Sequence, residues 1–425
     1  MAFPRLSSMV RELGRRCARC AREFPADSPD WTCSTCQANL DVLYDYRAVR
    51  KTWKREALVA NPDRSMWRYR ALLPLTEGAA VPSLQTGWTP LYLASRLGSE
   101  LGLRWLYLKD DSRNPTGSLK DRASAMAVGH ALAIGQRVAA CASTGNAASA
   151  LAGMCANAGM TSVIFVPETA PSGKLAQIIA FGAYLLRVQG SYDQAFDLAA
   201  SACFRFGWYN RNTGVNPYLS EGKKTVSFEM AEQLGWEVPD WVFVPVGDGN
   251  IIASVGKGFE ELLQVGFIEK LPRLVAVQAE GSSAIVDALL GDGVVRPVEV
   301  RTIADGIAVG RPRDPDRALR AVRQSNGLGL KVRDSELLEA QLLLARKTGV
   351  FVEPAAAASL AGLIRLSAGG EVAGDDRVVL LLTGSGLKDT AAVLDRARLP
   401  DPIPPTLDSV ERRLSEEPLS DGGSD

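Results

Sequence analysis

The sequence has almost no histidine, and this scarcity restricts the chemistry open to the chain. Its 425 residues contain one histidine, His130. A metal site with two histidine ligands is therefore excluded, and a Ser-His-Asp or Cys-His arrangement could use only this residue. His130 lies in the stretch AVGHALAIGQ, whose apolar spacing predicts an ordinary helix. We interpret His130 as a satisfied core or surface histidine and expect a chemistry that needs no imidazole.

An excess of charge of one sign is also missing. The 48 lysines and arginines balance the 48 aspartates and glutamates. A chain without net charge has no long-range field to attract nucleic acid or an anionic membrane, so we expect a small-molecule partner and neither of those. The N-terminal stretch lacks the apolar core of a secretory signal, which predicts a cytoplasmic location.

A long apolar run that could span a bilayer is absent as well. The longest uncharged stretch, residues 138–167, carries Ser143, Thr144 and Asn146 together with several glycines. Such a mixture is typical of a buried strand-helix-strand unit rather than of a membrane span.

Four of the seven cysteines form two closely spaced pairs near the N-terminus. The pairs are Cys17 with Cys20 and Cys33 with Cys36. This double Cys-x2-Cys spacing can place four thiolates tetrahedrally around Zn²⁺. A four-thiolate site has no open coordination position, so the metal would stabilise the module rather than catalyse a reaction. We therefore predict a zinc-ribbon-like module over residues 1–44.

From about Trp105 onward, short β-type runs alternate with helical stretches, which predicts an α/β fold with mostly parallel sheets. The runs are nearly continuous in apolar residues, so we expect both faces of each strand to be buried. Strands are expected at residues 104–110, 137–142, 161–168, 183–188, 241–246, 273–278 and 377–384. Residues 290–335 are too irregular to assign.

The polar, proline-rich residues 401–425 are expected to form a disordered tail. Between the cysteine module and this tail, the chain is expected to divide into two parts, residues 45–215 and 216–400.

Three glycine-containing turns each follow an apolar run, at residues 114–122, 142–150 and 245–254. In a doubly wound sheet such turns gather at the carboxyl ends of the strands, where helix N-termini offer free N–H groups to anions. None matches the Gly-x4-Gly-Lys-Ser/Thr loop or the Gly-x-Gly-x-x-Gly fingerprint of nucleotide sites. The first turn holds Lys120, and a desolvated lysine at a ligand crevice can form a Schiff base with an aldehyde.

The nonamer around Lys120, NPTGSLKDR, resembles the pyridoxal-phosphate lysine motif of the tryptophan-synthase-β-like, fold type II enzymes, and within them the threonine synthase group. The resemblance covers residues 83–390. Its other motifs follow in the family's order: GWTPLYLA, ASTGNAASALA, NPYLSEGKKT, PVGDGN, EPAAAASLAGL and LLTGSGLKD. The resemblance implies two doubly wound α/β domains, pyridoxal 5'-phosphate as cofactor and, since relatives are commonly dimers, a homodimer.

The resemblance also implies roles for individual residues. Lys120 would carry the cofactor and move protons, Asn146 would bond its 3-hydroxyl group, and Thr383 would face its ring nitrogen. A hydroxyl at that nitrogen favours elimination and replacement reactions over transamination. The cofactor phosphate would lie on Gly247, Asp248, Gly249, Asn250 and Ile251, and the substrate on Ser118, Ser143, Thr144, Asn212 and Thr213.

Two acidic residues near this predicted site need separate interpretation. Asp248 is unexpected beside a phosphate dianion, so it either points away or accepts a hydrogen bond. Glu353 is expected to cap a helix or orient a neighbour, outside the residues that contact ligands.

The threonine synthase group consists of lyases that convert O-phospho-L-homoserine and water into L-threonine and phosphate. This reaction needs a second anion site for the phosphate of the substrate. The arginine expected close to Asn216 is absent, because residues 218–220 are Tyr-Leu-Ser. Asn212 and Thr213, preceded by Arg211, could supply the clamp instead, and Lys223 or Lys224 could reach in, although surface solvation is the default expectation for these two lysines.

Two other functions stay open from the sequence. A related enzyme on the same scaffold would perform β-replacement on a phosphoserine-type substrate, as cysteate synthase does, or deaminate threonine or serine. A non-catalytic scaffold would instead use the cysteine module to bind protein or RNA through its arginines, which are Arg11, Arg15, Arg16, Arg19 and Arg22. The intact Lys120 motif argues against the scaffold.

Overall fold

The computed structural model describes residues 12–170, 172–394 and 401–416. The chain divides into two compact units, Met1–Asp389 and Thr390–Asp425. The second unit contains α15 (Ala391–Leu394) and α16 (Leu407–Glu416). Helix α16 lies within the segment that was predicted to be a disordered tail, so residues 407–416 differ from that prediction. The end of that segment, residues 417–425, and Arg11 lie outside the described residues.

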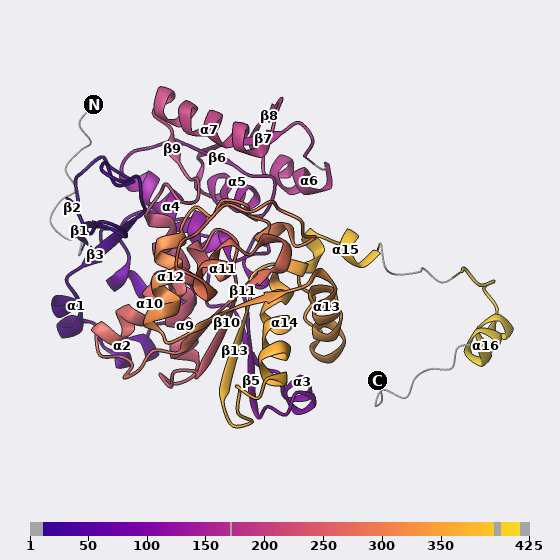
Figure 1. Cartoon of the computed structure of the whole chain (residues 1–425). Coiled ribbons are helices and arrows are strands. Elements are labelled where there is room, and N and C mark those ends of the chain that lie inside the picture. Colours follow the sequence, from indigo (N-terminus) through magenta and orange to yellow (C-terminus); the bar gives the residue numbers. More distant parts are fainter. Residues whose placement is uncertain (1–11, 171, 395–400, 417–425) are drawn as a thin grey trace. The chain divides into compact units, whose positions relative to one another are not determined.

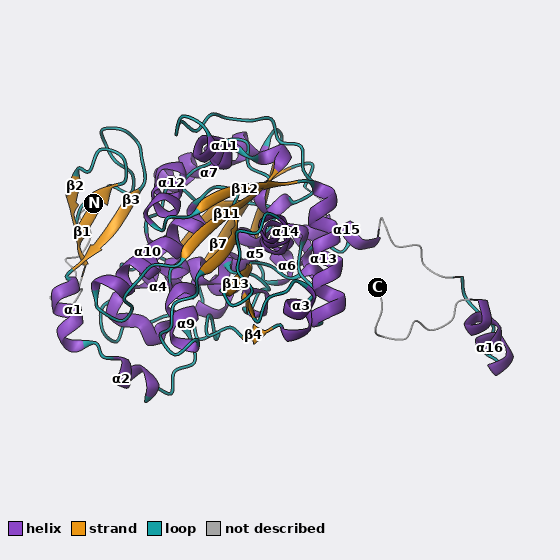
Figure 2. Ribbon diagram, turned by 60° about the horizontal axis from the view of Figure 1, so that its bottom comes forward, coloured by secondary structure: helices purple, strands orange, loops and turns teal. Residues whose placement is uncertain are grey.

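The first unit begins with a small antiparallel sheet, in the order β2-β1-β3, which Figure 2 shows as separate from the larger sheets. Its strands are β1 (Glu12–Cys17), β2 (Glu23–Pro25) and β3 (Leu40–Tyr44). Its apolar core is small and consists of Phe24, Ala38 and Leu40 beside the cysteines. A core of this size cannot stabilise a module alone, so this part needs a covalent cross-link, a bound metal ion or support from the rest of the unit.

The larger of the two main sheets has the strand order β12-β11-β10-β13-β5-β4. All neighbouring strands are parallel except the pair β4 and β5. The strands are β4 (Leu91–Leu93), β5 (Trp105–Asp110), β10 (Trp241–Pro245), β11 (Arg273–Ala279), β12 (Leu328–Val332) and β13 (Arg377–Leu382). Strand β5 therefore lies beside β13, although the two are far apart in sequence. The predicted boundary at residue 215 does not separate the two sheets, since β4 and β5 precede it.

The smaller main sheet is parallel throughout, with the order β8-β7-β6-β9. Its strands are β6 (Val138–Ala142), β7 (Thr161–Pro167), β8 (Tyr184–Val188) and β9 (Tyr209–Asn210). All seven predicted strands are present in the two sheets. The expectation of burial on both faces is wrong for β8, because β8 is an edge strand and its residues are partly or fully exposed.

Helices cover both faces of each main sheet, as Figures 1 and 2 show, and this confirms the doubly wound α/β fold. In the larger sheet, Trp241 and Phe243 pack with α13 and α14, while Val242 and Val244 belong to the cluster that includes α10 and α12. In the smaller sheet, Cys141 faces the α4 and α5 side, whereas the neighbouring strand positions face α7. These helices are α4 (Lys120–Ala133), α5 (Asn146–Ala158), α7 (Tyr192–Phe206), α10 (Asn250–Gln264), α12 (Pro315–Gln324), α13 (Asp334–Thr348) and α14 (Pro354–Ala368).

Shorter helices complete the first unit. They are α1 (Tyr46–Thr52), α2 (Arg55–Val59), α3 (Ser95–Glu100), α6 (Ser172–Ala180), α8 (Tyr218–Lys223), α9 (Thr225–Gln233) and α11 (Ala284–Leu290). Helix α8 packs against α4 and therefore lies next to the element that begins with Lys120.

The single histidine lies in a helix, α4, as expected, and of the two open positions, core and surface, it occupies the core. Its Nδ1 lies 3.0 Å from the Tyr209 hydroxyl, and its ring stacks on Tyr218 at 3.8 Å. Burial, helped by the charge of Arg15, lowers the pKa of His130 to about 3. The ring is therefore neutral in the folded protein at ordinary pH.

This low pKa predicts a pH-dependent stability. Because the folded pKa of His130 lies below the usual 6.5, the unfolded chain takes up the proton first, and stability falls as the pH drops from 6.5 toward 3. The loss is about 1.4 kcal/mol per pH unit within that window. His130→Phe should reduce this slope and keep the catalytic activity at pH 7.5. Unfolding free energies of the wild type and the variant, measured at pH 7.5 and pH 5.5, test this prediction. If the variant loses as much stability as the wild type between these two pH values, His130 is not the group responsible.

Candidate active site

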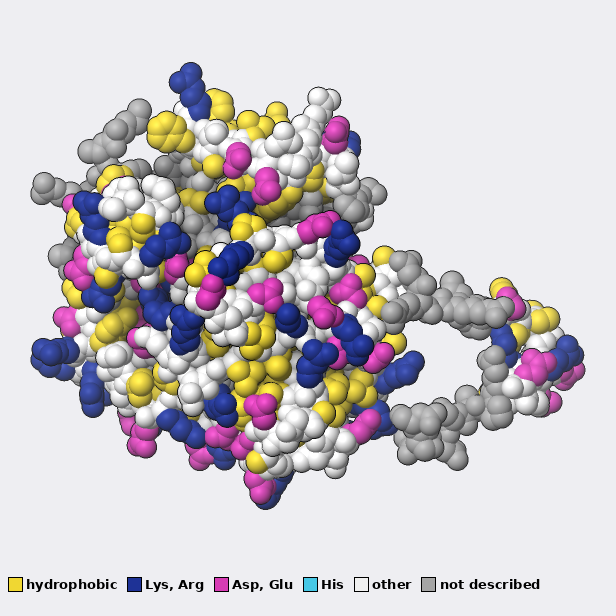
Figure 3. Space-filling model, viewed as in Figure 1, with side chains coloured by type: hydrophobic (Ala, Val, Ile, Leu, Met, Phe, Trp, Pro, Cys, Tyr) yellow, Lys and Arg dark blue, Asp and Glu magenta, His cyan; other side chains and the backbone are white. Residues whose placement is uncertain are grey.

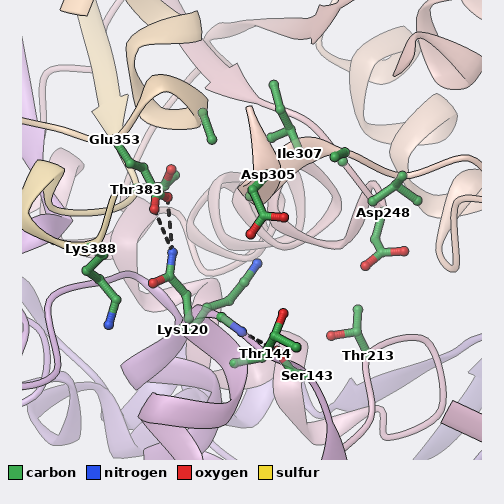
Figure 4. A pocket seen from close by; sticks show the side chains of 18 of the residues that line it. Lys120, Ser143, Thr144, Thr213, Asp248, Asp305, Ile307, Glu353, Thr383 and Lys388 are labelled. Carbon is green, nitrogen blue, oxygen red and sulfur yellow. Dashed lines mark hydrogen bonds between the residues drawn. The ribbon is translucent and has the colours of Figure 1, made fainter. Parts of the chain in front are cut away.

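A cavity of about 1120 Å³ lies at the carboxyl ends of four parallel strands, β5, β6, β10 and β13. All three glycine-containing turns predicted to bind a ligand contribute to its lining. Figure 4 shows Lys120 between two groups of side chains. Glu353, Thr383 and Lys388 lie on one side, and Asp248 and Thr213 lie on the other.

Lys120 is held at the start of α4 by a loop that is tied to the end of β13. The Leu119 N–H donates to the Thr383 carbonyl at 2.9 Å, and the Ser385 N–H donates to the Gly117 carbonyl at 3.0 Å. Gly117 has a φ of +88°, a conformation that residues with a side chain rarely adopt. The loop therefore fixes the direction in which Lys120 enters the cavity.

The Lys120 amine has the properties of a nucleophile. Within the described chain its Nζ makes no hydrogen bond. Burial is the largest cause that lowers the pKa of Lys120, the charge of Arg211 lowers it further, and Asp248 opposes both. A lowered pKa increases the fraction of neutral amine, which is the form that attacks a carbonyl.

The turn at residues 247–251 forms an anion cradle at the N-terminus of α10. Gly249 has a φ of +87°, and a Cβ there would lie 2.7 Å from the Asp314 carbonyl oxygen. A Cβ on Gly247 would lie 3.0 Å from the Ile307 Cα. Only glycine therefore allows this close approach, and the first N–H groups of α10 are available to a phosphate.

Side chains of the cradle brace the turn. The Asn250 amide donates to Ser220 Oγ at 3.0 Å and to Asp314 at 2.7 Å. The Asp248 carboxylate accepts a hydrogen bond from the Arg313 N–H at 3.1 Å. The carboxylate therefore acts as an acceptor for the loop that precedes α12, and its position relative to a phosphate stays a prediction.

At the opposite end of the cavity, Thr383, Glu353 and Asn146 come together. The Asn146 amide donates to both carboxylate oxygens of Glu353 at 3.0 Å. A Cβ on Gly384 would overlap the Glu353 carboxylate, so this position also needs glycine. Glu353 orients a neighbour, as expected, and it also belongs to the lining of the cavity. Its expected place outside the residues that contact ligands stays a prediction.

The STGN turn and the residues after β9 form a third part of the lining. It contains Ser143, Thr144, Asn212 and Thr213. The Asn212 Oδ1 accepts a hydrogen bond from the Ala142 N–H at 2.8 Å, while its Nδ2 is buried without a partner. Of the predicted substrate residues, Ser118 alone is not part of the lining, because its side chain is fully buried beneath the lysine loop.

Sequence reasoning missed several parts of the site. Residues 305–311, from the irregular region, line the cavity, and so do Tyr192 and Lys388. Surface solvation was the default expectation for Lys223 and Lys224, but both are fully buried, because polar partners inside the protein receive their ammonium groups. Lys223 donates to Asn250, and Lys224 pairs with Glu221 and Glu261. Glu221 lies three residues before Lys224, but Asn250 and Glu261 lie on α10, and no local pattern indicates those two partners.

The four N-terminal cysteines meet in one cluster. Their sulfur atoms all lie within 4.8 Å of one another, and all four are free thiols. The N–H groups of Arg19 and Cys20 point at the Cys17 sulfur at 3.4 Å, an arrangement that supports a thiolate. The residue types and separations suit one tetrahedral metal ion.

No helix in the described part of the chain is long and apolar enough to cross a membrane.

The family model of pyridoxal-phosphate dependent enzymes matches residues 82–384. Threonine synthase from Methanocaldococcus jannaschii is 38% identical over 95% of this chain and 99% of its own length. Threonine synthase from Methanosarcina acetivorans is 39% identical over 94% of this chain and 98% of its own length.

Among solved structures, threonine deaminase isoform 2 from Solanum lycopersicum shares the fold. Its TM-score is 0.63 at 22% identity, over 72% of this chain and 86% of that one. At this identity the likeness concerns the fold alone. Together with the matched family model and the near full-length relatives, the geometry around Lys120 leads to one conclusion: the chain belongs to the pyridoxal-phosphate dependent enzymes and, within them, to the threonine synthase family.

Proposed function

We propose that this chain converts O-phospho-L-homoserine and water into L-threonine and phosphate, with pyridoxal 5'-phosphate bound at Lys120. The observation that carries the proposal is the position of Lys120 in one cavity with two separate groups of anion-binding donors. One group is the cradle at residues 247–251, and the other surrounds Arg211 and Asn212. A phosphorylated cofactor and a phosphorylated substrate together need two such groups.

The lining suits this cofactor along its whole length. The glycines of the cradle leave space where a Cβ would collide, and α10 points its N-terminus at the same place. Lys120 provides a half-buried amine without a hydrogen-bond partner in the described structure. Thr383 offers a hydroxyl for the ring nitrogen, and Asn146, oriented by Glu353, offers its amide for the 3-hydroxyl oxygen.

The bound cofactor supplies an electron sink next to the amino group of the substrate. Lys120 then removes and returns protons at the substrate carbons, and its lowered pKa makes the neutral amine available as the base. Ser143, Thr144 and the N-terminus of α5 hold the α-carboxylate. Phosphate leaves from Cγ, and water adds at Cβ.

An assay of three reactions tests the proposed function. Purified protein with added cofactor should release phosphate from O-phospho-L-homoserine and form L-threonine in equal amounts. The same preparation should be tested with O-phospho-L-serine plus sulfite, and with L-threonine for 2-oxobutanoate. The proposal fails if 2-oxobutanoate from threonine is the sole product that forms.

We further propose that the cysteine cluster binds one structural Zn²⁺. The cluster geometry supports this proposal, because four thiols lie together in a small sheet whose apolar core is small. Cysteines without disulfide bonds are typical of a reducing cytoplasm. The module contacts the active-site part of the unit through Asn39, whose amide donates to the Gly214 carbonyl at 3.0 Å. It also contacts that part through Asp41, which pairs with Arg317 at 3.2 Å.

The homodimer expected from the family stays a prediction.

Removal of the metal ligands should destabilise the protein. A Cys17→Ser/Cys20→Ser variant should lose the roughly one zinc per chain expected of the wild type, and its melting temperature should fall by about 5–10 °C. Elemental analysis and thermal unfolding measure the two effects. Cys203→Ser, which changes a thiol outside the cluster, is the matched control and should keep its zinc. Unchanged zinc content in the double variant would refute the site.

A further inference from the structure

The side chain of Asn250, at the start of α10, is completely engaged within the protein. Its Nδ2 donates to Ser220 Oγ at 3.0 Å and to Asp314 Oδ2 at 2.7 Å. Its Oδ1 accepts a hydrogen bond from the Lys223 ammonium group. Both N–H bonds of the amide are therefore used, and its oxygen is occupied as well. Because Asn250 is the first residue of α10, these bonds fix the direction of the backbone N–H groups that face the anion cradle.

Asp314 supports the cradle from the side of α12. It is the N-cap residue of that helix and is fully buried. Its N–H donates to the Asp248 carbonyl at 2.9 Å, and a Cβ on Gly249 would lie 2.7 Å from its own carbonyl oxygen. Its carboxylate receives the Asn250 amide. Asp314 thus contacts three consecutive residues of the cradle, so a displacement of Asp314 would displace all three.

Arg317 holds the Asp314 carboxylate and reaches the cysteine module with the same guanidinium group. Its Nε and Nη2 donate to the two carboxylate oxygens of Asp314 at 2.8 and 2.6 Å. Its Nη1 donates to Asp41 Oδ1 at 3.2 Å and to the Leu40 carbonyl at 3.4 Å, and both of these residues belong to β3 of the module. Arg317 is only 3% exposed. A buried guanidinium keeps its charge and depends on its carboxylate partners for its position.

Asp41 is anchored within the cysteine module and is charged. It follows Leu40, which lies opposite Cys17 in the ladder between β1 and β3. Its carboxylate pairs with both Arg317 and Arg320. Burial alone would raise the pKa of Asp41, but the charges of these two arginines outweigh it and hold that pKa at about 2. A continuous series of charged and polar contacts therefore leads from the module to the cradle.

A second ion pair joins the module to α12 without reaching the cradle. Arg19 pairs with Asp316 at 2.9 Å, and the two side chains are 54% and 28% exposed. Among the described residues, the Asp316 side chain bonds to Arg19 alone. On the face of the first unit that Figure 3 presents, acidic and basic side chains are interspersed. Exposed pairs on such a surface contribute little, because water and salt screen them.

We propose that Asp41, acting through Arg317 and Asp314, positions the cradle at residues 247–251 and so sets the affinity of the enzyme for the phosphate group of its cofactor. This inference rests on the cofactor site of the proposed function. The cradle offers backbone N–H groups, and hydrogen bonds from such groups depend on direction as well as on distance. Asp41 and Arg317 are positioning residues, since neither lines the cavity. The cysteine module thereby contributes to cofactor binding from outside the active site.

Cofactor binding to Asp41→Asn tests the proposal. Full-length protein freed of cofactor is titrated with pyridoxal 5'-phosphate and, separately, with pyridoxal, which has the same ring and aldehyde but no phosphate group. The dissociation constant for pyridoxal 5'-phosphate should rise by about 3–30-fold, as is typical when one member of a coupled network is changed. The dissociation constant for pyridoxal should stay unchanged. Visible absorption measures both.

Three further variants make the test specific. Asp316→Asn removes a carboxylate that also joins the module to α12, and as the matched control it should change neither constant. Asp41→Glu keeps the carboxylate and should recover part of the affinity for pyridoxal 5'-phosphate. The double variant Asp41→Asn/Arg317→Met should bind pyridoxal 5'-phosphate no more weakly than Arg317→Met, because both substitutions interrupt one series of contacts.

Unchanged affinity of Asp41→Asn for pyridoxal 5'-phosphate overturns the inference. An equal loss of affinity for pyridoxal overturns it too, since that pattern indicates a general loss of structure rather than a displaced cradle. If the wild type binds pyridoxal 5'-phosphate no better than pyridoxal, the proposed cofactor site fails together with the inference. The proposed reaction can fail separately: the wild type would then form no threonine from O-phospho-L-homoserine, while its affinity for pyridoxal 5'-phosphate would still depend on Asp41.

Discussion

Replacing Lys120 with alanine is expected to abolish covalent attachment of the cofactor and to lower phosphate release from O-phospho-L-homoserine by at least about 10³–10⁴-fold. The variant loses both the amine that holds the cofactor and the base that moves protons. Its stability without cofactor should be close to that of the wild type, because the Lys120 Nζ makes no hydrogen bond within the described residues. The visible absorption of the purified protein and initial rates of phosphate release measure these effects.

Two further variants make this test specific. Lys120→Arg keeps a positive charge but cannot form a Schiff base, so it should be as inactive as the alanine variant. Lys331→Ala changes an exposed lysine that pairs with Asp287, and it should behave like the wild type. If borohydride reduction still fixes cofactor to Lys120→Ala at the wild-type level, another lysine carries the cofactor. Lys223 and Lys388 would then be the residues to examine, as buried or partly buried lysines of this region.

The parts of the site that the sequence predicted are those whose geometry is local. Lys120, the cradle at residues 247–251 and the STGN turn each combine a strand end, a glycine and a helix start within a few residues. The partners of Lys223 and of Glu353 lie on distant segments, which a short motif cannot indicate. The Glu353 carboxylate, for example, receives Asn146, which lies 207 residues earlier in the chain.

The same distinction explains the fold. The seven predicted strands are apolar runs long enough to be recognised, and all of them except the edge strand β8 are largely buried. Strands β4 and β9 have three and two residues and offer no periodicity to detect. The pairing of β5 with β13 is non-local, so the sequence could not show that an early strand completes the larger sheet.

A buried network of charges stabilises the beginning of α4, and with it the position of Lys120. Arg122 pairs with Asp111 at 2.6 Å and also with Glu229, which receives Lys109 at 2.7 Å. All four side chains are completely buried. Burial alone would raise the pKa of Glu229, but the charges of Arg122 and Lys109 outweigh it and hold that pKa at about 2. Glu229 is thus ionised at any pH at which the enzyme would work.

Glu229→Gln should destabilise the protein by about 3–5 kcal/mol, since removing one member of a buried ionic network leaves its partners uncompensated. Lys109 would lose its carboxylate, whereas Arg122 would keep Asp111. Because the folded pKa of Glu229 lies below its usual value of 4.5, its ionic contribution is present above pH 4.5 and is lost as the pH falls toward 2. Urea unfolding at pH 7.5 gives the change in free energy.

The matched control is Glu237→Gln, which removes an exposed carboxylate paired with Arg377 and should change the unfolding free energy by less than about 1 kcal/mol. A second variant, Lys109→Met/Glu229→Gln, should recover part of the lost stability, because it removes the unpaired ammonium together with its partner. In this double variant, Asp111 alone neutralises Arg122. If Glu229→Gln is no less stable than Glu237→Gln, the network does not stabilise α4, and the position of Lys120 then depends on the contacts of its loop with β13.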